Sequence, residues 1–302
     1  MSFSSQSAIL PNAGSFALYV TFNVKNAEQH VLQQLQLIPS LVDDLNKQQD
    51  GANLNVAISF SYSMWEKMDQ AMPDELKEFT PLGSGDITAP ATGGDILLHI
   101  HSNRHDLHFY ILRKLLLLCE GNLEVVDETY GYRYLDSRDM TDFIDGTENP
   151  KDEGRSEVAI IHDGNFAGGS YVMVQRFIHN LPAWNRLSVA AQEKVIGRTK
   201  PDSIELDDVP KASHVGRVDI KEEGKGVKIL RHSLPYGSVS GEHGLLFIAY
   251  CNRVHNFKVM LESMYGETDG HSDQMLKFTT AVTGAYFFTP SVEMLNILKL
   301  SA

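Results

Sequence analysis

The stretch LLHIHSNRHDLHFYIL, residues 97–112, decides the fold, because a related stretch, LFIAYCNRVHNFKVML, recurs at residues 246–261. In each copy the first residues alternate like an apolar strand, and the later ones show helical spacing. The identical positions, 149 residues apart, are Leu97, Asn103, Arg104 and Leu112, matched by Leu246, Asn252, Arg253 and Leu261. The offset is close to half the chain, so the match predicts a duplicated domain.

The elements around the first copy follow a familiar order. Period-two alternation predicts strands at 16–24, 54–60, 95–101 and 123–130, and helical spacing predicts helices at 27–45 and 104–119. Pro39 is expected to kink or divide the first helix. The order βαββαβ is that of the ferredoxin-like fold, an antiparallel sheet with two helices on one face.

The second half repeats this order. Strands are predicted at 170–179, 227–231, 245–250 and 284–288, and helices at 188–197 and 254–265. The predicted fold class is therefore α+β, with tandem duplicated ferredoxin-like domains and antiparallel sheets. We place the domains at residues 1–138 and 139–302, joined near 136–141. Between the predicted elements at 197 and 227 the chain is irregular, and long irregular loops are often functional.

Composition narrows the function classes. The chain has 302 residues, 42% of them hydrophobic, and its 26 Lys and Arg against 39 Asp and Glu give a net charge of −13. This charge opposes binding to nucleic acid, which requires clustered cations. The first residues lack the basic start and apolar run of a signal peptide, and no run is long enough to predict a membrane span. We expect a cytoplasmic protein without nucleic-acid or membrane partners.

The cysteines and the histidine-rich strand suggest packing. Cys119 and Cys251 lie in or beside apolar segments without CxxC spacing, so both are predicted to be buried thiols. A metal site among the first-half histidines is a weaker hypothesis, because apolar or aromatic residues occupy the equivalent positions in the second half. These histidines are His99, His101, His105 and His108, and their counterparts are Ile248, Tyr250, Val254 and Phe257.

The segment TDFIDGTENP, residues 141–150, carries an apolar approach directly into turn residues. Asp145, followed by Gly146, is the carboxylate of this turn. Two interpretations stay open from these residues alone. Asp145 caps the turn by accepting backbone N–H bonds, or it works with partners from elsewhere in the chain.

Two further segments supply such partners. His214 lies in SHVGRVD, within the irregular stretch, and is either structural or a ligand. Arg231 lies in ILRHSLPYG, at the end of an apolar strand, where its guanidinium needs a carboxylate, a phosphate or an anionic ligand. A structural ion pair is the simpler explanation of Arg231.

Together, FIDGTEN, SHVGRVD and ILRHSLPYG resemble the dye-decolorizing peroxidase family, in particular its bacterial cytoplasmic branch, whose members are similar in length to this chain. The resemblance covers nearly the whole sequence, and the motifs occur in the family's order. One position departs from the family pattern. The family's loop usually begins with glycine where Asp142 stands here, so we expect a less sharply bent start of the loop.

The resemblance implies one haem b per chain, held mainly by the second domain. His214 is implied to be the axial ligand and the only protein ligand to the metal. Asp145 and Arg231 are implied to act on the other face, Asp145 as proton carrier and Arg231 as fixed positive charge, with Gly146 and Ser233 beside the cofactor. Asp273 is either the partner of His214 or a helix N-cap. Met275, Leu276 and Phe278 would then line the apolar pocket.

The implied function is a peroxidase that reduces H₂O₂ through a ferryl intermediate and oxidises dyes, phenols or porphyrinogens. The alternatives are a haem-trafficking or haem iron-release protein, and a cofactor-free ligand-binding module. The combination of Asp145 with Arg231 favours peroxide chemistry, since haem carriage does not require it. The family suggests a homo-oligomer, a dimer or larger, and electron transfer to the surface. Tyr130, Tyr132, Tyr134 and Tyr236 are candidate relays or packing residues.

Overall fold

Each half of the chain builds a four-stranded antiparallel sheet in the computed structural model, which describes residues 3–301. In the first half the order is β6-β1-β5-β2, so the first strand lies between the fourth and the third, as in a ferredoxin-like fold. The strands are β1 Phe16–Val24, β2 Asn55–Phe60, β5 Ile96–Ser102 and β6 Leu123–Tyr132.

The second half repeats the arrangement. Its strands pair in the order β14-β7-β12-β11, and the short strands β10 and β13 add to β12 and β7. These strands are β7 Ser170–His179, β10 Leu230–Arg231, β11 Leu234–Gly237, β12 His243–Cys251, β13 Thr279–Ala281 and β14 Ala285–Thr289. The predicted fold class of tandem ferredoxin-like units is confirmed.

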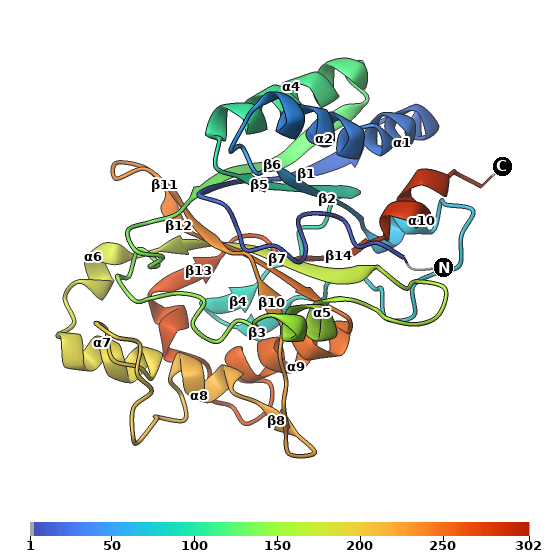
Figure 1. The fold of residues 1–302 in the computed structure, drawn as a ribbon. Helices are drawn as coiled ribbons and strands as arrows, with labels where there is room; N and C mark the ends of the chain where they lie inside the picture. Colours follow the sequence, from blue (N-terminus) through green and yellow to red (C-terminus); the bar gives the residue numbers. More distant parts are fainter. Residues whose placement is uncertain (1–2, 302) are drawn as a thin grey trace.

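The two sheets also join at their edges, which the sequence did not predict. Tyr236 of β11 pairs with Gly131 of β6, and Phe288 of β14 pairs with Phe60 of β2. With the pairing of β12 and β7, the strands close into a ring. Figure 1 shows the sheets stacked between two layers of helices, with α1, α2 and α4 on one outer face and α7, α8 and α9 on the other.

The principal helices form where helical spacing predicted them. Pro39 lies in the first turn of α2 and divides the first helix into α1 Glu28–Gln36 and α2 Ile38–Gln48, because proline suits a helix start and breaks a helix interior. The repeated junction gives α4 His105–Leu118 in the first half and α9 Val254–Met264 in the second. Both helices follow the third strand of their sheet, as duplication requires.

The strand predicted at 227–231 was wrong in extent. Only Leu230 and Arg231 pair with β12, as β10, and the chain returns to β12 as β11 from Leu234. The reason lies in α9, where the Asn256 side chain donates to the carbonyl oxygen of Lys228 at 2.7 Å and occupies that backbone group.

The irregular stretch before β10 contains the helix α8 His214–Val218 and a hairpin of β8 Lys221–Glu222 and β9 Lys225–Gly226. The remaining elements are α3 Tyr62–Trp65, β3 Leu82–Ser84, β4 Ile87–Ala89, α5 Glu153–Ala159, α6 Leu181–Trp184, α7 Val189–Ile196, η1 Gln274–Lys277 and α10 Val292–Ile297. Within residues 3–301, no helix has the length and apolar character needed to cross a bilayer. Cys119 and Cys251 are buried free thiols, as predicted.

Candidate active site

A cavity of about 320 Å³ lies in the second half of the chain, and the residues that line it run from Asp139 to Thr279. Its size falls within the range of small-molecule and cofactor sites. Most of its wall is apolar, with contributions from strands β7 and β12 and from helices α8 and α9. The apolar lining includes Met173, Phe177, Val215, Val218, Phe247, Met260, Leu261 and Leu276.

His214 enters this cavity from the first position of the short helix α8. The preceding Ser213 caps the helix, because its hydroxyl accepts the backbone N–H of Gly216 at 3.1 Å. A Cβ at Gly216 would lie 2.4 Å from the carbonyl oxygen of Pro210, so only glycine permits this close approach. The SHVG sequence therefore fixes where His214 begins the helix.

A carboxylate holds the imidazole of His214 in one orientation. Nδ1 of His214 lies 2.6 Å from Oδ2 of Asp273, which is fully buried, while Oδ1 of Asp273 accepts the N–H of Met275 at 2.8 Å. Asp273 is thus both a helix cap and the partner of His214, and the two interpretations of the sequence hold together. With Nδ1 engaged, Nε2 is the nitrogen available to a ligand. The side chain of His214 is 33% exposed and borders the cavity.

Burial lowers the pKa of His214, but the Asp273 carboxylate more than offsets this, and the pKa lies above its ordinary value. Arg231 lowers and Asp145 raises the same pKa. The charges of Arg231 and Asp145 therefore act on the pKa of His214 across the cavity that all three residues line.

Arg231 and Asp145 form an ion pair on the cavity wall. Nη1 of Arg231 lies 3.2 Å from Oδ1 of Asp145, and both side chains are about one quarter exposed, at 25% and 26%. Oδ1 of Asp145 also accepts the N–H of Gly146 at 2.7 Å. Asp145 therefore both caps its turn and meets a charged partner. Both of these contacts use Oδ1, so neither of them occupies Oδ2.

Gly146 and Asn149 shape the loop that carries Asp145. Gly146 has φ of 80°, a left-handed conformation that glycine adopts readily. Asn149, which sequence reasoning did not select, donates from Nδ2 to the carbonyl oxygen of Arg231 at 2.9 Å and accepts its N–H at 3.0 Å. This reciprocal pair ties the loop to β10. The signal was visible in FIDGTEN, but an asparagine in a turn usually serves the turn itself.

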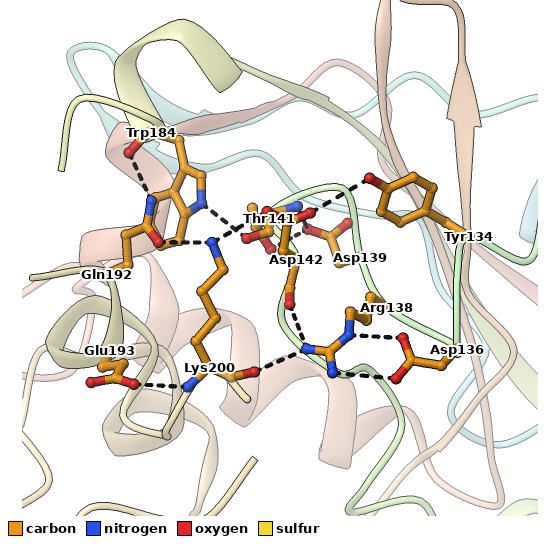
Figure 2. A network of polar contacts seen from close by, with 10 residues as sticks. All are labelled: Tyr134, Asp136, Arg138, Asp139, Thr141, Asp142, Trp184, Gln192, Glu193 and Lys200. Carbon is orange, nitrogen blue, oxygen red and sulfur yellow. Dashed lines mark hydrogen bonds and ion pairs between the residues drawn. The ribbon is translucent and has the colours of Figure 1, made fainter. Parts of the chain in front are cut away.

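Asp142, where the family pattern has glycine, is held by the polar network in Figure 2. Its φ is 67°, so the loop starts with a left-handed residue, and the expectation of a less sharply bent start was wrong. Arg138 donates from Nη1 to the carbonyl oxygens of Asp142 at 2.8 Å and of Lys200 at 2.9 Å. Nζ of Lys200 lies 3.2 Å from Oδ2 of Asp142. These contacts offset the strain of a non-glycine residue in this conformation.

A second histidine–carboxylate pair also lines the cavity, and no pattern in the sequence predicted it. Nε2 of His179 lies 3.0 Å from Oδ1 of Asp139, and Nδ1 of His179 lies 2.7 Å from the Thr279 hydroxyl. Burial raises the pKa of Asp139, but His179 and Thr141 outweigh it and lower the pKa to about 2. The pair joins the segment that follows β6 to β7 and β13.

Arg217, in SHVGRVD, anchors α8 and was also missed. It is 5% exposed, and its guanidinium contacts the Asp269 carboxylate at 2.9 and 3.0 Å and the carbonyl oxygen of Ser263 at 2.9 Å. The helix that presents His214 is therefore fixed to the end of α9. The sequence signal that could have identified Arg217 is its place close to the candidate ligand His214, because an arginine that is buried there needs a charged partner.

Other predicted residues lie outside this group. The hydroxyl of Ser233 accepts the N–H of Ile248 at 3.3 Å, and Ser233 is not among the residues that line the cavity. Met275 and Leu276 line the cavity, whereas Phe278 packs edge-on against Trp184. The four candidate relay tyrosines also lie away from the lining; they are Tyr130, Tyr132, Tyr134 and Tyr236.

The histidines of the first half are placed by β5 and α4. His99 and His101 are fully buried between the sheets, and Nε2 of His108 lies 2.7 Å from the hydroxyl of Ser102. In the part of the chain that the structure describes, no three His, Cys, Asp or Glu residues are grouped to hold a metal ion.

Reduction of a peroxide requires a proton carrier and a fixed positive charge opposite the centre that supplies electrons. Asp145, Arg231 and the carboxylate-supported His214 border one cavity on a doubled ferredoxin-like fold, and this combination points to a peroxidase. The family models described as "Dyp-type peroxidase, N-terminal" and "Dyp-type peroxidase, C-terminal" match residues 6–133 and 136–294. The chain belongs to the Dyp-type peroxidase family.

Comparisons with individual relatives agree with this assignment. The dye-decolorizing peroxidase of Mycobacterium tuberculosis is 39% identical over 279 residues, which cover 90% of this chain and 83% of the relative. The solved dye-decolorizing protein from V. cholerae is 66% identical, with a TM-score of 0.97 and coverage of 98% of this chain and 100% of that one. A DypB variant from Rhodococcus jostii RHA1, solved in complex with heme, is 35% identical, with a TM-score of 0.93 and coverage of 99% and 100%.

Proposed function

We propose that this peroxidase binds one haem b in the cavity, reduces H₂O₂ there, and oxidises small organic reductants such as dyes, phenols or porphyrinogens. The observation that carries the proposal is the pairing of charges around an apolar cavity. The His214–Asp273 pair and the Arg231–Asp145 pair both reach this cavity, which has a volume of about 320 Å³.

The residues present fit a haem. A porphyrin needs apolar walls, which methionine, phenylalanine, valine and leucine side chains supply. Its iron needs an axial donor, and Nε2 of His214 is a neutral-imidazole donor of the kind that peroxidases use. When bound, haem supplies the redox centre that takes the two oxidising equivalents of peroxide. His214 would be the only protein ligand to this metal.

Asp273 prepares His214 for that role. A carboxylate at Nδ1 fixes the ring orientation and the tautomer, and it raises the donor strength of Nε2. The 2.6 Å contact between Nδ1 and Oδ2, with Asp273 fully buried, supports this assignment. Asp273 is therefore a positioning residue that acts through His214.

Asp145 and Arg231 would act on the peroxide itself. Oδ2 of Asp145 takes the first proton and returns it to the departing oxygen, since Oδ1 already holds the Gly146 N–H and the Arg231 guanidinium. The permanent charge of Arg231 stabilises the negative charge that develops as the O–O bond breaks. Gly146 permits the turn, and Asn149 sets the position of the loop relative to β10.

The alternatives have less support. A haem-trafficking or iron-release protein does not require the Arg231–Asp145 pair, and relatives at 35–39% identity are named dye-decolorizing peroxidases. A cofactor-free binding module does not require a carboxylate-supported imidazole on the cavity wall.

Ser233 stays a secondary candidate beside the cofactor, and the four tyrosines stay candidate electron relays.

We further infer two domains, residues 1–138 and 139–302, and a cytoplasmic homo-oligomer. The division is supported by the four-stranded ferredoxin-like order that each half forms within the joined sheet. Two unpaired buried cysteines are typical of a reducing compartment. Self-association is supported by the exposed apolar face of α4, where Phe109, Tyr110 and Leu117 are 60%, 41% and 66% exposed.

The experiment is an absorption spectrum of the purified protein before and after one equivalent of H₂O₂, for the parent and for His214→Ala. The parent should show a Soret band that changes rapidly with peroxide, and the variant should be folded but largely free of haem. The exposed His162→Ala serves as the control and should behave like the parent. A normal Soret band in His214→Ala would mean that another residue binds the iron.

A further inference from the structure

A group of aromatic residues fills the space between the two sheets, outside the cavity described above. Tyr19, His99 and Tyr250 are at most 1% exposed, and so are most of their neighbours. The ring of Tyr19 stacks on that of His99, with centroids 5.0 Å apart and an interplanar angle of 8°. The ring of Tyr250 also lies next to His99, with its centroid 5.9 Å from that of His99. His101 and His232 complete the group, stacked at 5.6 Å.

One tyrosine in this group has a base as its hydrogen-bond partner. The hydroxyl of Tyr250 lies 2.8 Å from Nδ1 of His99. The hydroxyl of Tyr19 instead donates to the carbonyl oxygen of His232, and that of Tyr236 donates to the carbonyl oxygen of Phe177. Among the tyrosines of residues 3–301, only Tyr250 has a hydroxyl hydrogen-bonded to an imidazole.

The direction of this bond follows from counting buried polar atoms. Nε2 of His99 has no partner among the described residues. If Tyr250 donates to Nδ1 of His99, the only group left unpaired is the N–H at Nε2 of His99. If His99 donates instead, the hydroxyl hydrogen of Tyr250 and the lone pair of Nε2 are both unpaired, which costs more. Burial, reinforced by His101 and His232, lowers the pKa of His99 well below its ordinary value, so the ring is neutral and able to accept.

The pair lies next to the strands that form the active site. Tyr250 on β12 is opposite Leu230 on β10, and the next pair in the register is Arg231 with Ala249. Neighbouring residues on a strand point to opposite faces, so Arg231 faces the cavity while Tyr250 faces the space between the sheets. The charge of Asp145 contributes to the raised pKa of Tyr19, behind burial and Tyr250, which also places the stack near the cavity.

We propose that Tyr250 and His99 form a buried oxidisable pair that receives one oxidising equivalent when peroxide has reacted and no reductant is present. The inference rests on the proposed peroxide reaction in the cavity. Tyr250 gives one electron to the oxidised cofactor, and its hydroxyl proton moves to Nδ1 of His99, which leaves a neutral tyrosyl radical and an imidazolium. An electron from a reductant and return of the same proton restore the pair. The proton transfer adds no charge to the interior, because loss of the electron has already made the pair positive.

The other buried tyrosines are poorer donors for a physical reason. A phenol gives up an electron easily only when its proton can leave at the same time, and a dry interior offers no water to take it. A backbone carbonyl accepts a hydrogen bond but is too weak a base to take a proton. Tyr265, buried with an unpaired hydroxyl, is therefore a matched control for Tyr250.

The test is freeze-quench electron paramagnetic resonance of the haem-loaded protein after one equivalent of H₂O₂ without reductant, with ring-deuterated tyrosine to identify the radical. The parent and Tyr265→Phe should give a tyrosyl signal, and Tyr250→Phe and His99→Gln should each lower it by roughly tenfold or more. Nitrogen-15 NMR of the haem-free protein provides a second readout. The nitrogen-15 resonance of Nδ1 of His99 should shift in Tyr250→Phe. This readout does not depend on turnover.

The outcomes separate the two proposals. If peroxide is consumed and the signal persists unchanged in Tyr250→Phe, the oxidisable pair is wrong while the peroxidase function stands. If the haem-loaded parent does not consume peroxide, the proposed function fails and this inference fails with it. If His99→Gln does not fold, Tyr250→Phe against Tyr265→Phe still decides the question.

Discussion

Nδ1 of His214 lies 2.6 Å from Oδ2 of the fully buried Asp273, although 59 residues separate them in the sequence. The contact joins the start of α8 to the start of η1, and it converts an ordinary histidine into an oriented donor. Arg217 and Ser213 hold α8, so the geometry is set before any cofactor binds. A donor prepared in this way loses little freedom when it binds a metal.

Asp273→Asn should weaken haem retention by roughly 10-fold to 100-fold, because an amide supports the imidazole less well than a carboxylate does. The cap on Met275 is kept, since the amide oxygen can still accept its N–H. Haem transfer to an apo-globin measures retention, and resonance Raman of the reduced protein measures donor strength at the iron. The surface variant Asp163→Asn is the control. Unchanged retention together with an unchanged iron–imidazole frequency would show that Asp273 is only a helix cap.

Asn149→Ala should slow the reaction with peroxide by roughly tenfold or more, because small displacements of reacting groups are costly. The variant removes both bonds to the Arg231 backbone while leaving Asp145 and Arg231 in place. The observed rate should fall, with the Soret band and haem retention unchanged. A parent-like rate would mean that the loop is positioned without Asn149.

Asp142 offers a matched pair of variants. Both Asp142→Gly and Asp142→Ala lose the contact with Lys200, but only glycine relieves the φ of 67°. The glycine variant should therefore be more stable than the alanine variant by about 1 kcal/mol. Urea unfolding of both proteins provides the comparison. Equal stabilities would indicate that the left-handed conformation carries no strain.

The Asp139–His179 pair predicts a pH dependence of stability. The pKa of Asp139 is about 2 in the folded protein, below its ordinary value of 3.8, so its contribution is fully present above pH 3.8 and is lost as the pH falls toward 2. The contribution is roughly 2 kcal/mol. Urea unfolding of the haem-free protein between these pH values measures the free energy of unfolding. This free energy should depend less steeply on pH in Asp139→Asn than in the parent. The same slope in the parent and the variant would contradict the prediction.

The sequence predicted the repeated junction, the order of elements and several residues of the cavity, among them Asp145, His214 and Arg231, because each carries a local signal. Apolar periodicity identifies strands and helices, and Asp145, His214 and Arg231 stand in unusual local settings. Closure of the ring was not predicted, since Tyr236 and Gly131 meet through a single register pair that no local pattern encodes. His179 and Asp139 were missed for the same reason, because their pairing depends on how the linker packs against β7.

We propose that Asp145 and Arg231 divide proton transfer and charge stabilisation during peroxide reduction. Stopped-flow absorption of the haem-loaded protein, mixed with H₂O₂ at several pH values, tests it most directly. Arg231→Leu should lower the rate of the spectral change by roughly 10² to 10³. Asp145→Asn should also be slower, while Glu148→Gln, a carboxylate change on the same loop, should match the parent. If Asp145→Asn and Arg231→Leu both react as fast as the parent at every pH, the assignment of this site is wrong.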